Sequence, residues 1–233
     1  MCRKAPAKNQ GCNHMICRQP CGFQICWICL GSCFRHDYYR CNKYRGKGGS
    51  PDDVSQMNAK KHLERYTHYY ERWDTNDKSR KRALADLNTA RDEHIDRLAD
   101  TQRATQAELK CVVEAWEQIV KCRCILKWSY VYRYYVSESE SGKLDFFGHL
   151  LGEAENAVER LHNWVEKEMD KYLLAECVSE VIQVFHTKLT DLTLVTKMYF
   201  ENLVRAWEND LCGADNVVSE STESSRKRKD MKD

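Results

Sequence analysis

The sequence has little proline, almost no net charge and no long apolar run. All three prolines lie at or before Pro51, so none interrupts a helix in the rest of the chain. No apolar stretch is long enough to cross a bilayer, and the amino-terminal segment lacks the apolar core of a secretory signal peptide. A net charge of +2 argues against nucleic acid or a membrane surface as the partner.

Cysteine, by contrast, is abundant and clustered. Eight of the 13 cysteines lie close to the amino terminus: Cys2, Cys12, Cys17, Cys21, Cys26, Cys29, Cys33 and Cys41. Because no signal peptide is evident, we expect a reducing compartment, the cytoplasm and/or nucleus, where such a cluster binds metal more often than it forms disulfides. The other five are predicted to be buried, inert thiols in helices: Cys111, Cys122, Cys124, Cys177 and Cys212.

Composition changes sharply near residue 45, which predicts two units. Residues 1–44 are rich in cysteine, glycine and aromatics and have no helical period. The stretch 45–53 (RGKGGSPDD) combines glycine, serine and proline and is typical of a linker. Residues 54–212 have a helical composition, and the polar, charged tail at 213–233 is predicted to be disordered.

Four helices are predicted in the second unit. Apolar residues recur every three or four positions over about 54–101, 106–136, 144–174 and 178–211. Stripes of this width need partners, so we expect a mainly α, antiparallel helical bundle with coiled-coil-like spacing.

Two segments allow a second interpretation. The aromatic run WSYVYRYYV (128–136) has the composition of a base-stacking surface, but its place on a helix favours aromatic packing. The basic run RKRK (226–229) has the composition of a nuclear address, although a solvated tail is favoured.

The spacing of four residues predicts a zinc site. Cys26, Cys29, His36 and Cys41 form the pattern Cys-x2-Cys-x6-His-x4-Cys. Zinc takes four thiolate or imidazole ligands in tetrahedral geometry, and pairs close in sequence supply two of them from one turn.

An earlier pair, Cys17 and Cys21, suits a second zinc ion, with Cys2 as its third ligand. A Cys-x-x-Cys partner for Cys2 would fall before Met1, so this site is expected to be incomplete in the chain as given. The thioether of Met1 is a poor zinc ligand.

Cys12, in the string GCNHM, belongs to neither ligand set. A cysteine spared from metal, with His14 two residues on, is a candidate nucleophile. On spacing alone, His14 can equally be a metal ligand.

The string GCNHMICRQPCGFQICWICLGSCFRHDYYRCNKY closely resembles the Rcat domain, the second RING-like element of RING-between-RING ubiquitin ligases. Later strings resemble the helical Ariadne domain, most like that of plant members: RYTHYYERW, AWEQIVKCRCILKWSYVYRYY, GEAENAVERLH and YFENLVRAWENDL. The resemblance covers about residues 2–211. It implies a small zinc-bound Rcat module, RING2-like with irregular β structure, followed by the helical bundle.

The resemblance also implies a function. In the family, the cysteine matching Cys12 accepts ubiquitin as a thioester, and the histidine matching His14 is the general base toward the substrate lysine. Cys2, Cys17 and Cys21 match ligands of a first structural zinc, and Cys26, Cys29, His36 and Cys41 match those of a second. The implied partners are ubiquitin, a ubiquitin-conjugating enzyme, a protein substrate and, by family analogy, cullin-RING ligases.

The chain departs from the family pattern in several places. A full member carries a first RING domain, which binds the conjugating enzyme, and an in-between-RING domain, so we expect an amino-terminally truncated form. Gln24 stands where many members have glutamate, and Cys33 is an extra thiol. Near Arg82 and Ala83, animal relatives have an aromatic–acidic pair that holds the catalytic module shut. The alternative function is a catalytically impaired, zinc-containing binding or regulatory module.

Overall fold

The computed structural model describes residues 11–44, 54–102, 105–137, 139–173 and 182–227. The linker predicted at 45–53 and the predicted ligand Cys2 lie outside these residues. The first described segment holds two short strands, β1 (His14–Ile16) and β2 (Gln24–Cys26), and one short helix, α1 (Tyr38–Asn42). The remaining segments are helical: α2 (Val54–Thr89), η1 (Ala90–His94), α3 (Ile95–Gln102), α4 (Gln106–Tyr135), α5 (Ser141–Leu173) and α6 (Ile182–Lys227).

Residues 11–44, which we call the cysteine module, are organised around one hairpin. β1 and β2 pair antiparallel, with His14 opposite Cys26. Helix α1 begins after Asp37, whose carboxylate accepts a hydrogen bond from the backbone N–H of Arg40 and so caps the helix. The predicted small module with irregular β structure is therefore present, with little apolar core of its own.

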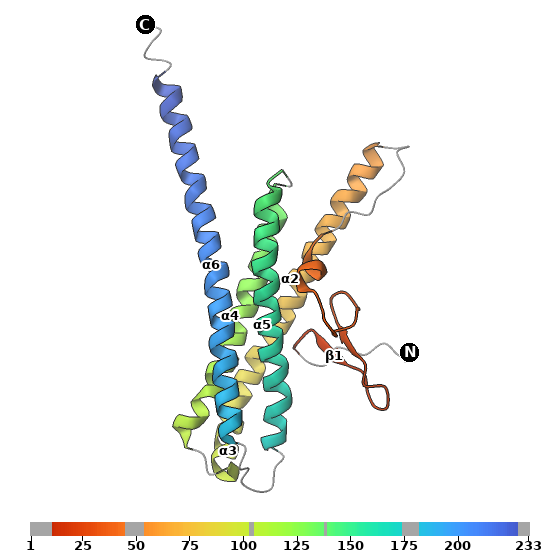
Figure 1. Ribbon diagram of the computed structural model, residues 1–233, viewed down its shortest axis with the longest axis vertical. Helices are drawn as coiled ribbons and strands as arrows, with labels where there is room; N and C mark the ends of the chain where they lie inside the picture. The colour runs from red at the N-terminus through yellow and green to blue at the C-terminus, as the bar shows by residue number, and fades with distance from the viewer. Residues whose placement is uncertain (1–10, 45–53, 103–104, 138, 174–181, 228–233) are drawn as a thin grey trace.

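The long helices run alternately up and down, as predicted (Figure 1). α4 lies at the centre and packs against α2, α5 and α6. Several α4 side chains are fully buried, which explains its position: Val112, Ala115, Ile119, Cys122 and Leu126. The predicted first helix is one continuous rod made of α2, η1 and α3, in which the π-helical turn η1 shifts the register of the apolar stripe.

The last helix is longer than predicted. α6 continues to Lys227, whereas the sequence pattern predicted a helical end near residue 211 and a disordered tail from Gly213. The tail contains no proline, and one glycine inside a helix costs only about 1 kcal/mol relative to alanine. A polar segment of this kind can therefore extend an existing helix without burying an apolar face. Residues 228–233, including part of the RKRK run, lie outside the described residues.

The aromatic run at 128–136 divides between core and surface. Tyr130 is fully buried and its hydroxyl donates to Glu155, so packing is the correct interpretation there. Trp128 and Tyr135 are 54% and 78% exposed. None of the described helices is both long and apolar enough to span a membrane.

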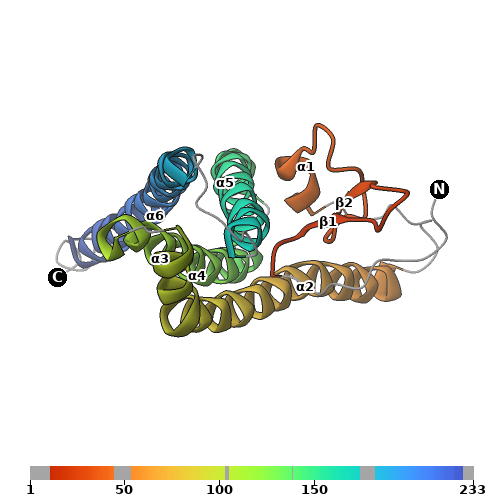
Figure 2. The same cartoon turned by 90° about the horizontal axis from the view of Figure 1, so that it is seen from below.

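The cysteine module lies in the corner between α2 and α5 (Figure 2). Helix α1 lies beside α5, where the absence of a side chain at Gly148 makes room for it. A Cβ at that position would lie 2.8 Å from the ring of Tyr39. The hydroxyl of Tyr39 donates to Asp145, one turn earlier on α5. The helical unit therefore forms one wall of the candidate site.

Candidate active site and metal centre

Four predicted ligands converge at one end of the hairpin. Cys26 ends β2, Cys29 follows in the next turn, His36 precedes α1 and Cys41 lies within it. Their ligand atoms all lie within 4.8 Å of one another. The Sγ atoms of Cys26 and Cys41 are 4.0 Å apart, and Cys29 Sγ lies 3.2 Å from His36 Nε2. Three sulfurs and one imidazole nitrogen at this separation can hold a tetrahedral metal ion.

The hydrogen bond between Cys26 and Cys41 couples their titration. It lowers the pKa of Cys26 and raises that of Cys41, so the Cys26 thiol ionises first. A thiolate is the form of cysteine that binds metal. The donor set therefore fits a thiolate-binding cation such as zinc.

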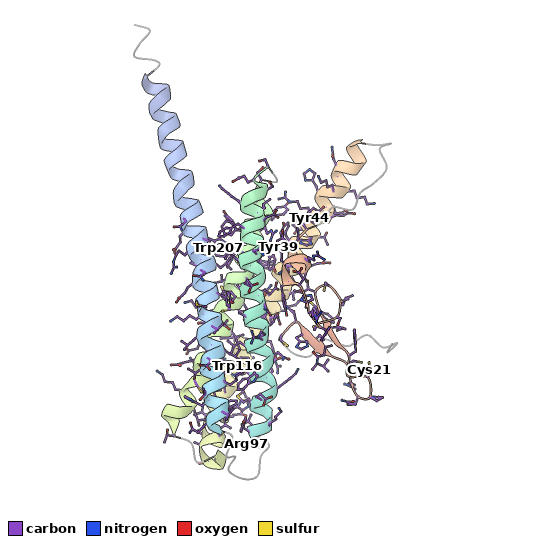
Figure 3. All side chains as sticks on the ribbon, in the orientation of Figure 1. Cys21, Tyr39, Tyr44, Arg97, Trp116 and Trp207 are labelled. Carbon is purple, nitrogen blue, oxygen red and sulfur yellow. The ribbon has the colours of Figure 1, made fainter. Side chains whose placement is uncertain are left out.

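The other predicted ligand set is not brought together within the described residues. Cys17 and Cys21 belong to no group of three or more nearby ligands there, while Cys2 lies outside. The loop that carries Cys17 and Cys21 closes through a bond from the N–H of Cys17 to the carbonyl of Phe23. Figure 3 shows Cys21 at the end of the module that points away from the helices. The three-ligand site stays a prediction.

Cys12 is fully buried. Its thiol donates to the carbonyl of His14 at 3.3 Å, and the ring Nε2 of His14 lies 2.9 Å from the side-chain oxygen of Gln24. The carbonyl of Asn13 accepts from the N–H of Trp27 at 2.8 Å. Because Trp27 directly follows the candidate ligand Cys26, the loop that carries Cys12 is attached to the candidate metal site.

Helix α5 covers this loop with two carboxylates. Glu166 accepts from the N–H of Gly11 at 2.9 Å, and Glu159 accepts from the backbone and side-chain nitrogens of Asn13, both at 2.7 Å. On α2, the hydroxyl of Ser79 donates to the carbonyl of Gly11 at 2.5 Å. These contacts run along both sides of Cys12.

Only glycine fits at position 11. An added Cβ would lie 2.6 Å from the ring of His162, and that ring is itself fully buried. The glycine before the candidate nucleophile therefore lets the loop approach α5 closely.

The buried carboxylate of Glu159 is neutralised by Arg123 of α4. The guanidinium of Arg123 lies 2.7 Å from Glu159 and 2.9 Å from Nδ1 of His162, and Arg123 is fully buried. A buried ion pair of this kind contributes little net stability, but removing one partner leaves an uncompensated charge that costs about 3–5 kcal/mol. The pair therefore fixes the position of Glu159 against the loop.

The covered thiol is in its unreactive form. Burial raises the pKa of Cys12 above its usual range, and the carboxylates of Glu166 and Glu159 raise it further. Since the thiolate is the nucleophile, this arrangement suppresses reaction at Cys12. Burial also raises the pKa of Cys33, to about 12, so the extra thiol is no better activated.

Sequence reasoning missed the residues that cover Cys12. The signal was a polar row on α5, at Glu155, Glu159, His162 and Glu166, spaced by four, three and four positions. It runs directly beside the apolar stripe of the same helix. Glu155, Glu159 and His162 are buried, and buried polar groups need partners from outside their own helix. Here the cysteine module and α4 supply them.

No family model matches the chain. It is 46% identical over 232 residues to the probable E3 ubiquitin-protein ligase ARI7 of Arabidopsis thaliana, covering 96% of this chain and 41% of that protein. The probable ligase ARI8 of the same plant is 48% identical over 90% of this chain and 39% of its own length. The probable ligase rbrA of Dictyostelium discoideum is 33% identical over 87% of this chain and 39% of its own.

The chain thus spans about two fifths of the length of the curated relatives it matches. Within that span the similarity runs through both the cysteine module and the helices, because it covers about nine tenths of the chain or more in each plant relative cited above. Over nearly its whole length the chain is therefore similar to one part of these Ariadne-family proteins, each of which is named a probable E3 ubiquitin-protein ligase.

Proposed function

We propose that the chain is the catalytic part of a RING-between-RING ubiquitin-protein ligase, which passes ubiquitin through a thioester on Cys12 to a substrate lysine. The observation that supports this most is the isolation of Cys12 from the metal quartet. Cys12 lies on a loop tied to the metal centre but is not one of its ligands, and His14 follows two residues later. The relatives are named ubiquitin ligases, which agrees with this chemistry.

The reaction has two steps. In the first, the Cys12 thiolate attacks the thioester carbonyl of ubiquitin on a conjugating enzyme; a new C–S bond forms and the enzyme's thiolate leaves. In the second, a substrate amine attacks the Cys12 thioester, an isopeptide bond forms and the Cys12 thiolate leaves. His14 accepts the proton that the amine loses.

Gln24 orients His14 in this scheme. Its side-chain oxygen accepts a hydrogen bond only if Nε2 of His14 carries the hydrogen, which leaves Nδ1 as the basic nitrogen. A neutral amide selects this tautomer but stabilises an imidazolium less than a carboxylate does. Zinc held by Cys26, Cys29, His36 and Cys41 supplies a structural support for the loop and takes no part in either step.

In this proposal the described arrangement is a resting state. Ubiquitin transfer requires the loop at Cys12 to leave α5, because the thiol is fully buried. The proposed partners are ubiquitin, a protein substrate, a conjugating enzyme brought by a RING domain of the kind that the family resemblance implies, and cullin-RING ligases as activators. The proposed location is the cytoplasm and/or nucleus.

We expect the purified protein to carry at least one zinc ion per chain in the quartet. His36→Ala removes the imidazole ligand and should lower the zinc content by about one equivalent, because three thiolates do not complete the tetrahedron. Elemental analysis after dialysis measures this directly. A matched His186→Ala change on α6 should leave the content unchanged. Less than about half an equivalent in the unaltered protein contradicts the assignment.

Glu166→Ala should open the resting state. It removes the acceptor of the Gly11 N–H and one carboxylate that raises the pKa of Cys12. A hydrogen bond to a charged group is typically worth 1.5–3 kcal/mol, so alkylation of Cys12 by iodoacetamide should be about 10- to 100-fold faster. Peptide mapping by mass spectrometry reports the rate at Cys12 itself.

The matched control is Glu168→Ala, two residues along the same helix, where the carboxylate pairs with Lys171 instead of the loop. It should leave the alkylation rate unchanged. Equal rates in the Glu166→Ala and unaltered proteins show that this carboxylate does not hold the loop.

The opened protein also allows a test of the transfer chemistry without a recruiting domain. Ubiquitin activated as the thioester of a small thiol is offered to the Glu166→Ala protein. We expect one ubiquitin adduct that a reducing agent removes. An opened protein whose Cys12 is readily alkylated but that takes no ubiquitin points to the alternative, a non-catalytic binding or regulatory module.

A further inference from the structure

We propose that metal retention in the quartet and burial of Cys12 are coupled. The helices hold both ends of residues 26–41, the metal-binding loop. Packing of the cysteine module against the helices therefore slows metal loss, and loss of the metal exposes Cys12. The inference rests on the proposed metal occupancy of Cys26, Cys29, His36 and Cys41, and on contacts of residues outside that quartet.

The clamp begins at the ligand Cys41. Arg72 of α2 donates from Nη2 to the carbonyl of Cys41 at 2.5 Å, and from Nη1 to the carbonyl of His68 on its own helix at 3.0 Å. Arg72 is buried. The backbone of a metal ligand is therefore held by a buried guanidinium from the helical unit.

The next residue, Asn42, is held directly by two helices and, through Glu155, by a third. Its carbonyl lies 3.1 Å from Nε2 of His68 on α2, and its side-chain amide donates to Glu155 of α5. Glu155 also accepts from the hydroxyl of Tyr130 on α4 at 3.0 Å. Asn42 and Tyr130 are fully buried, so residue 42 cannot move outward without breaking several buried polar contacts at once.

The Cys26 end of the metal-binding loop is held through the loop that carries Cys12 (residues 11–14). The N–H of Trp27, next to the ligand Cys26, donates to the carbonyl of Asn13, and Asn13 is bound by Glu159 of α5. At the Cys41 end, Tyr44, just beyond α1, adds to the attachment, since its ring packs edge-on against His68 and its hydroxyl donates to the backbone carbonyl of Lys61 (Figure 3).

Both ends of the loop that carries the four ligands are thus anchored in the helical unit. The metal joins these ends to each other, because Cys26 and Cys41 belong to the same quartet. A ligand that binds one state of a two-state element more tightly shifts the element toward that state, and the coupling is reciprocal. Opening the site should therefore weaken metal retention, even when the change lies away from the metal.

The test measures zinc release into a chromogenic chelator. Arg72→Ala removes the clamp on Cys41, and we expect release about tenfold faster or more. Glu166→Ala touches Gly11 and not the metal-binding loop, yet it should also speed release because it opens the site. Arg91→Ala is the matched control: Arg91 pairs with Glu117 at an exposed position in the helical unit and should have no effect.

Glu166→Ala decides the outcome, because Glu166 does not contact the metal-binding loop, whereas Arg72→Ala alone could act by unfolding α1. Faster release from Glu166→Ala, with unchanged helical content by circular dichroism, supports the coupling. If Glu166→Ala releases zinc at the rate of the unaltered protein, the coupling is overturned. The zinc content of the quartet and the loading of ubiquitin on Cys12 are measured separately and do not depend on that result. If the unaltered protein carries no zinc, the coupling falls together with the metal assignment.

Discussion

Replacing Cys12 with alanine should abolish the reducible ubiquitin adduct completely. The effect is the largest expected, because no other described thiol combines a place outside the metal quartet with a neighbouring histidine base. In the Glu166→Ala background, where the loop is released, Cys12 should react with ubiquitin activated as a small-molecule thioester. In the Glu166→Ala, Cys12→Ala double variant no reducible adduct should appear, as judged by gel electrophoresis with and without reductant.

The matched control for this experiment is Cys33→Ala. Cys33 lies on the same module, is not one of the four clustered ligands, and burial raises its pKa to about 12. Its removal should leave the adduct intact. An adduct that survives Cys12→Ala but disappears in Cys33→Ala would falsify the assignment of the nucleophile.

Replacing His14 with alanine should separate loading from discharge. The first step needs only the Cys12 thiolate and an activated thioester, so the adduct should still form. The second step needs a base for the lysine amine, and general-base assistance typically contributes about 10²- to 10⁴-fold. Discharge to free lysine, followed after loading has been stopped, should slow by a factor in that range.

Zinc content distinguishes a base from a ligand in the same variant. His14 is not among the clustered ligands of the described residues, so His14→Ala should retain zinc, whereas His36→Ala should lose it. His62→Ala, an exposed position on α2, serves as the matched control for discharge. If His14→Ala loses zinc and fails to load, His14 acts as a ligand and the proposed base is wrong.

Much of the site could be predicted from short stretches of sequence because its chemistry is local. The quartet Cys26, Cys29, His36 and Cys41 spans only 16 residues, and its spacing alone predicted the cluster that the structure brings together. Cys12 and His14 were singled out by their place outside that spacing. The long helices were predicted for a similar reason: a three- and four-residue apolar repeat reports directly on a buried helical face.

The end of the last helix could not be predicted in this way. Beyond Leu211 the chain has no apolar stripe, so periodicity carries no information about whether the helix continues to Lys227. An existing helix can extend through polar residues at little cost per residue, since nucleation has already taken place.

Only the tertiary structure decided the state of Cys12. Glu159 and Glu166 lie 146 and 155 residues from the positions they bind, and Arg123 comes from a third element. Nothing in the local pattern of α5 says whether its polar row faces solvent or a partner. The assignment depends on how the cysteine module docks against α2 and α5, and that docking is what buries the thiol and raises its pKa.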